Sequence, residues 1–79
     1  MKRYKVGLIR VLTTEDRELL NLHGKLLEQY FPMLEVESRC IPDQPEGIHN
    51  DATMASGEPK VVELAKQMWQ EGFEAVIVS

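Results

Sequence analysis

Apolar residues gather in three short runs along the chain, and each run has the character of a β-strand. Residues 4–12 (YKVGLIRVL) are rich in β-formers and almost continuously apolar, which is typical of a central strand in a parallel sheet. Residues 34–41 (LEVESRCI) alternate apolar and polar positions, so one face is drier than the other and an edge strand is predicted. Residues 73–79 (FEAVIVS) give the third predicted strand.

A helix is predicted between the first two strands. Thr13, with Asp16 three residues later, is typical of an N-cap, and acidic residues in the first turn favour the helix dipole. The helix is expected to run to about Tyr30, because Pro32 disfavours helical geometry at Phe31. Its apolar residues share helical spacing and predict one buried stripe: Leu19, Leu20, Leu22, Leu26, Leu27 and Tyr30.

A second helix is predicted before the third strand. Residues 42–57 contain several turn formers and are expected to be a long connection, of a length that is usually functional or mobile. The helix is then expected over residues 56–71 or 58–71, with Pro59 in its first turn and Gly72 as its stop. Its predicted buried stripe consists of Val61, Val62, Ala65, Met68 and Trp69.

The order strand–helix–strand–helix–strand predicts the fold class. Right-handed crossovers give an α/β protein with a parallel sheet between two helical layers, a βαβαβ half of a flavodoxin-like lobe with strand order 2-1-3. The direction in which successive strands are added to the sheet reverses between strands one and three, and ligands bind at such a switch point in open α/β sheets. Arg10 to Thr14 and Ser79 are expected to border that crevice.

Composition narrows the classes of partner. The net charge is −4, with nine basic residues scattered among thirteen acids, which argues against nucleic acid. Neither a membrane-spanning run nor a signal peptide is evident, so we expect no membrane partner and a cytoplasmic location. A domain of 79 residues with three parallel strands is marginally stable alone, and we expect a homo-oligomer.

Polar residues after the first strand are candidates for binding a substrate. Arg10 can clamp a carboxylate with two hydrogen bonds, although a solvated arginine paired with Glu15 or Asp16 is the alternative. Thr13 and Thr14 can offer donors to an anion at the helix N-terminus, although the acids beside them favour capping alone. A dinucleotide site is not indicated, because the strand is not followed by a glycine-rich turn.

Other reactive side chains are less informative. His49 lies in the long connection, where it is either a surface residue or part of a lid that closes over substrate. Cys40, the only cysteine, is expected to be a small buried residue of its strand, and His23 is expected to pack within its helix. Because the cysteine and the two histidines lack ligand spacing, we expect no metal.

Four segments together resemble a known family. They are residues 5–13 (KVGLIRVLT), 14–32 (TEDRELLNLHGKLLEQYFP), 38–51 (SRCIPDQPEGIHND) and, most specifically, 57–79 (GEPKVVELAKQMWQEGFEAVIVS). The chain resembles the N-terminal part of the aspartate/glutamate/hydantoin racemase superfamily, closest to its hydantoin racemase branch. The resemblance implies that residues 1–79 are an N-terminal fragment of one lobe, with the rest of that lobe and a second lobe elsewhere.

The resemblance also implies a reaction. Family members are cofactor-independent isomerases of amino acid metabolism. Two cysteines, one from each lobe, act on opposite faces of a stereocentre next to a carbonyl, one removing a proton and the other returning one. The first cysteine follows the strand that ends here at Ser79, and Cys40 matches neither, so no catalytic residue is expected within residues 1–79 and this piece alone should be inactive.

The substrate and the class of protein stay open from the sequence. Hydantoin racemases carry an asparagine-proline-asparagine turn where this chain has Arg10 to Thr13, so a hydantoin, an amino acid and a dicarboxylate are all candidates. Arg10, Thr13, Thr14, His49 and Ser79 are the expected substrate-binding residues. The alternative is a non-catalytic flavodoxin-like domain that binds a ligand or regulates a partner.

Overall fold

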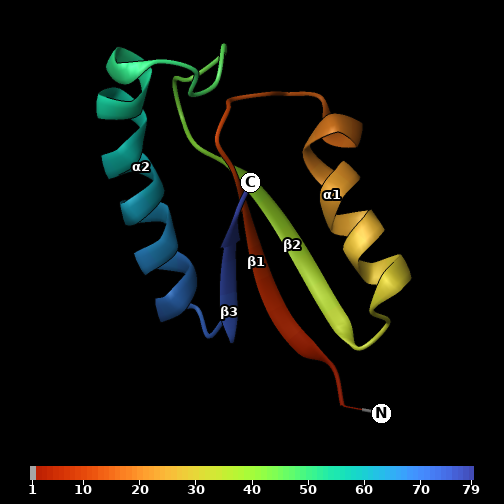
Figure 1. The fold of residues 1–79 in the computed structure, drawn as a ribbon. Helices are drawn as coiled ribbons and strands as arrows, with labels where there is room; N and C mark the ends of the chain where they lie inside the picture. The colour runs from red at the N-terminus through yellow and green to blue at the C-terminus, as the bar shows by residue number, and fades with distance from the viewer. Residues whose placement is uncertain (1) are drawn as a thin grey trace.

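The computed structural model describes residues 2–79 and contains one three-stranded parallel sheet between two helices (Figure 1). Strand β1 (Tyr4–Arg10) is followed by helix α1 (Arg17–Tyr30), strand β2 (Leu34–Cys40), helix α2 (Asp51–Gln70) and strand β3 (Ala75–Val78). The strand order is β2-β1-β3, so β1 is central. The predicted α/β class, βαβαβ order and 2-1-3 topology are confirmed.

The starts of both helices differ from the prediction. Asp16, not Thr13, caps α1, because its carboxylate accepts the backbone N–H groups of Glu18 and Leu19. Helix α2 begins at Asp51, several residues earlier than predicted, because Asn50 and Thr53 exchange hydrogen bonds in a capping box. Pro59 therefore lies inside the helix, where it has no N–H to donate to the preceding turn.

The main core lies between the sheet and α2. Four residues form its centre, each at most 2% exposed: Ile9, Ile41, Met68 and Phe73. Gly7 of β1 makes room for this packing, because a Cβ there would lie 2.5 Å from Met68 Cε. The core therefore depends on the absence of a side chain in the central strand.

Both predicted apolar stripes are partly wrong. On α1, Leu22 and Tyr30 are 48% and 77% exposed, and the buried residue of the helix is Gly24, which lies against β2. On α2, Trp69 is 68% exposed, whereas Leu64, outside the predicted stripe, packs against the core.

An ion pair joins the edge strand to the end of α2. Arg39 of β2 donates two hydrogen bonds to the carboxylate of Glu71, at 2.8 and 2.7 Å. These hydrogen bonds, with a smaller contribution from the charge of Arg39, hold the pKa of Glu71 below its usual range. Since the folded pKa lies below the unfolded value of about 4.3, the stabilisation is complete above that pH and is lost as the pH falls through the folded pKa.

We therefore expect Glu71→Gln to lower stability at pH 7 and to have progressively less effect in acid. Urea unfolding at pH 7, 5 and 3 measures this difference. Glu63→Gln, an exposed glutamate of the same helix, is the matched control and should show no such trend. A Glu71→Gln deficit that stays constant down to pH 3 would contradict the assignment of the pair.

Candidate functional site

Three side chains form a row across the carboxyl end of the sheet. Arg10 is in register with Cys40 of β2. Ser79 donates its N–H to the carbonyl of Ile9, and its own carbonyl accepts the N–H of Val11, so Ser79 lies opposite Arg10 on the other side. Residues in register on parallel strands project from the same face, which places a thiol, a guanidinium and a hydroxyl side by side on the face that carries α1.

Contacts with α1 and the loop before it confirm that face. Arg10 Nη1 donates to the carbonyl of Leu19 at 2.7 Å, and the thiol of Cys40 lies 3.7 Å from the carbonyl of Thr14. His23 Nδ1 lies 2.9 Å from Ser79 Oγ. The structure therefore adds His23 to the group, and no pattern in the sequence connects His23 with Ser79.

Arg10 is not the solvated surface arginine that the sequence allowed as an alternative. It is only 7% exposed, and none of the salt bridges within residues 2–79 involves it. The alternative that pairs it in solvent with Glu15 or Asp16 is wrong, because the Asp16 carboxylate caps α1 and Arg10 donates to Leu19. Its Nε is the one buried side-chain nitrogen or oxygen without a hydrogen-bond partner among residues 2–79.

Thr13 holds the loop after β2 through hydrogen bonds that the sequence did not predict. Its hydroxyl donates to the carbonyl of Ile41 and accepts the N–H of Gln44 at 2.7 Å, while its own N–H donates to the carbonyl of Gln44 at 2.8 Å. Gln44 is 5% exposed, and its side-chain oxygen accepts from Ser56 and Lys60 of α2. Thr13 and Gln44 thus fix the loop at residues 41–50 to both β1 and α2.

Thr13→Val should therefore destabilise the chain. The change leaves the N–H of Gln44 and the carbonyl of Ile41 without their hydroxyl partner, which costs about 1–3 kcal/mol for groups that water does not reach. Thr14→Val is the matched control, because that hydroxyl accepts one exposed hydrogen bond, from the N–H of Asp16. Equal urea midpoints for the two variants would contradict this role.

Substrate binding by Thr14 and His49 stays a prediction. The N–H of His49 donates to Thr53 Oγ1 at 2.9 Å, and its ring lies 3.4 Å from Asn50 Nδ2, so its contacts are local to the start of α2. The hydrogen bonds of residues 2–79 do not join His49 to Arg10 or Ser79. Thr14 borders the row through its carbonyl, which faces the thiol of Cys40.

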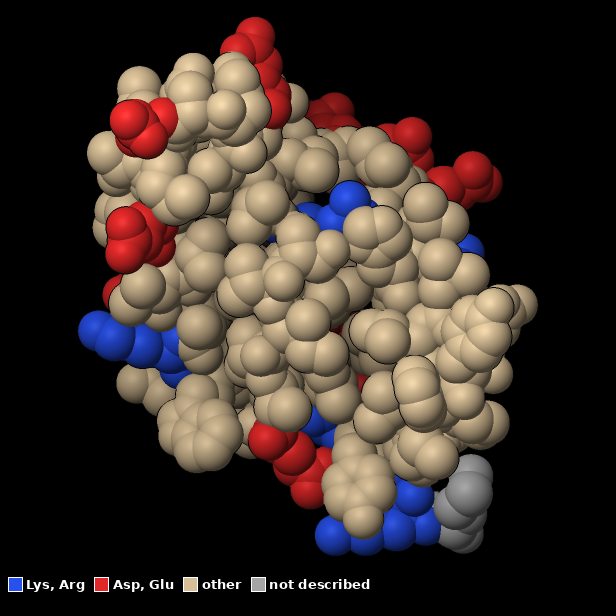
Figure 2. Space-filling model, viewed as in Figure 1, with Lys and Arg blue, Asp and Glu red and all other residues tan. Residues whose placement is uncertain are grey.

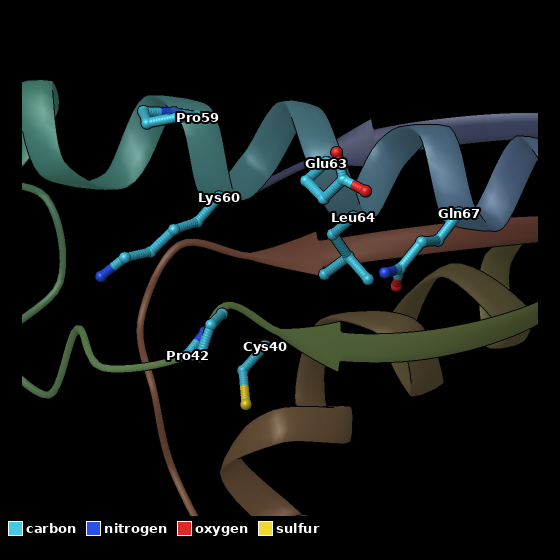
Figure 3. A pocket seen from close by; sticks show the side chains of 7 residues that line it. All are labelled: Cys40, Pro42, Pro59, Lys60, Glu63, Leu64 and Gln67. Carbon is cyan, nitrogen blue, oxygen red and sulfur yellow. The ribbon is translucent and has the colours of Figure 1, made fainter.

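Cys40 also borders a hollow of about 480 Å³ between the end of β2 and α2 (Figure 3). Pro59, Lys60 and Leu64 line it from the helix, together with Glu63 and Gln67. Figure 3 shows the sulfur of Cys40 pointing away from α2. The thiol therefore belongs to the row on the α1 side, and Cys40 is half-buried, whereas a buried residue was predicted.

The part of the chain that the structure describes contains neither a cluster suited to a metal ion nor a helix suited to spanning a membrane. Across residues 2–79, three or more His, Cys, Asp or Glu side chains do not cluster in a way that would hold a metal ion. Of the two helices described, neither combines the length and apolar character needed to cross a membrane. In comparisons with known proteins, neither a protein-family model nor a curated protein matches the chain.

Proposed function

We propose that residues 1–79 form the first half of a lobe of a cofactor-independent racemase or epimerase. The observation that carries the proposal is the position of Arg10 beside Ser79 at the carboxyl end of the sheet, next to the switch point between β1 and β3. Ligands of open α/β sheets bind at such a point. The substrate is a small molecule with a stereocentre next to a carbonyl.

In this proposal the two reacting thiols lie outside residues 1–79. One removes the proton from the stereocentre and the other returns a proton to the opposite face. Arg10, Thr14 and Ser79 line one wall of the site, and His23 orients the hydroxyl of Ser79 through their 2.9 Å contact. Thr13 supports this wall through the loop rather than by touching the substrate.

The test is hydrogen exchange at the stereocentre. The full-length protein that contains this chain is incubated in D₂O with aspartate, glutamate or a 5-substituted hydantoin, while NMR follows the loss of the Cα–H signal and polarimetry follows the rotation. We expect exchange with racemisation in the presence of EDTA and without added cofactor. Absence of exchange with every substrate of these classes would favour the alternative, a non-catalytic ligand-binding domain.

Cys40 supplies an internal control. Because it is not one of the two proposed thiols, Cys40→Ala should leave the exchange rate of the full-length protein within a few-fold of the unchanged protein. Residues 1–79 alone should show no exchange. Loss of exchange on Cys40→Ala would instead make Cys40 one of the reacting thiols.

We also propose that the protein works as a homo-oligomer in the cytoplasm. Apolar side chains stay exposed on both sides of β3, among them Ile77, Val78 and Trp69, at 39%, 54% and 68%. Figure 2 shows charged side chains mainly toward the margins of one view, with uncharged residues across much of the middle. Analytical ultracentrifugation of the full-length protein tests this part, and a monomer at all concentrations would contradict it.

A further inference from the structure

Arg10 carries a buried positive charge without an opposite charge beside it. The residue is 7% exposed, its Nη1 donates to one neutral carbonyl, that of Leu19, and its Nε has no partner. An ionised group in this situation costs several kcal/mol unless it is paired. A guanidinium carries its charge permanently in proteins, so this cost has to be met by a partner.

The groups around Arg10 do not offset this charge. The nearest helix end is the N-terminus of α1, which is the positive end of the helix dipole. The Asp16 carboxylate is already engaged by the N–H groups of Glu18 and Leu19. On either side in the sheet are the thiol of Cys40 and the hydroxyl of Ser79, both of which are neutral donors.

We propose that Arg10 is a specificity-determining residue that selects a ligand with a carboxylate over a neutral ring. A guanidinium binds a planar carboxylate through two parallel N–H···O bonds, and Nε is one of the donors of that fork. Ser79, in register with Arg10 and in contact with His23, can supply a further donor. A hollow of about 290 Å³ is lined by Ser79, His23, Tyr30 and four apolar side chains, and it leaves room for the rest of the ligand beside Ser79.

The inference rests on the proposed function and deepens it, since it chooses amino acids or other carboxylates over hydantoins. Binding is therefore measured without turnover, so that the carboxylate-binding proposal and the racemase proposal can fail separately. Nitrogen-15 NMR of the Arg10 Nε–H group is followed while acetate, acetamide, hydantoin or inorganic phosphate is added at constant ionic strength. The Arg10→Lys spectrum, which lacks this signal, identifies it.

We expect acetate to shift the Arg10 Nε–H signal in a saturable way, and acetamide and hydantoin to leave it unchanged. Acetate should also raise the melting temperature of the unchanged protein. Arg10→Met should abolish that rise, and Arg10→Lys should weaken acetate binding by about 10-fold or more, as loss of a charge-assisted bond predicts. Arg10→Met, which removes the unpaired charge, should fold in acetate-free buffer.

Three results would overturn the proposal. The first is an Nε–H signal that does not respond to acetate, which needs no variant to interpret. The second is an equal response to hydantoin or a stronger response to phosphate, which would make Arg10 unselective or a phosphate ligand. The third is the same acetate-dependent rise in Arg10→Met as in the unchanged protein. If acetate binds but the stereocentre never exchanges deuterium, the racemase proposal fails while this one stands.

Discussion

Ile9→Asp is expected to unfold the chain. Ile9 is fully buried in the central strand, in the cluster with Ile41, Met68 and Phe73. A carboxylate there would have no partner in an apolar site, which costs several kcal/mol. A domain of this size has only a few kcal/mol of stability to lose. Far-UV circular dichroism during heating should show no cooperative transition for the variant.

Val78→Asp is the matched control for this prediction. Val78 is the register partner of Ile9 on β3, and its side chain is 54% exposed. The same carboxylate on the neighbouring strand stays hydrated, so the loss of stability should be under about 1 kcal/mol, as for other exposed positions. Equal melting temperatures for the two variants would show that the core does not lie between the sheet and α2.

The fold was predictable because its signals are local. The continuous apolar run at residues 4–12 identified the central strand, and the alternation at residues 34–41 identified an edge strand whose dry face lies against α1. Gly72 was correctly expected just beyond the end of α2. Right-handed crossovers then left one arrangement of three strands, which is the observed order.

The start of α2 differs from the prediction because Pro59 does not lie in the first turn of the helix. Proline is most common in the first turn of a helix, but here it follows eight residues that are already helical. Asn50 followed three residues later by Thr53 was the available signal for the true start. Ser56 and Lys60 donate hydrogen bonds to the side chain of Gln44, and these bonds hold the helix on both sides of the proline. Such tertiary contacts cannot be read from the sequence.

The candidate site was predictable only in part. The carboxyl ends of β1 and β3 were expected to meet, and they bring Arg10 and Ser79 together. The burial of Arg10 and the contact of His23 with Ser79 depend on how α1 is rotated over the sheet. We expect the close approach of Gly24 to β2 to set that rotation, and no periodicity of apolar residues reports this approach. The sequence therefore predicted which edge of the sheet carries the site, but it did not predict that the charge of Arg10 is buried there.

Gly24→Val is expected to lower the stability of the chain by about 1–3 kcal/mol, as overpacking does in closely packed interiors. A Cβ at Gly24 would lie 2.9 Å from Ser38 Oγ and 3.2 Å from Val36 Cγ1. Valine is a better helix former than glycine, so intrinsic propensity alone predicts a gain of a few tenths of a kcal/mol. The sign of the measured change thus decides whether the contact with β2 or the helix propensity dominates.

A double-mutant cycle tests the contact itself. Ser38→Ala removes the oxygen nearest to the new side chain, so Gly24→Ala should be tolerated better in the Ser38→Ala background than in the unchanged chain. Lys25→Val, on the exposed side of the same helix, is the control for valine in α1 and should change the urea midpoint little. Additive effects in the cycle would mean that α1 moves freely away from β2. In that case Gly24 would not set the rotation that buries Arg10 and brings His23 to Ser79.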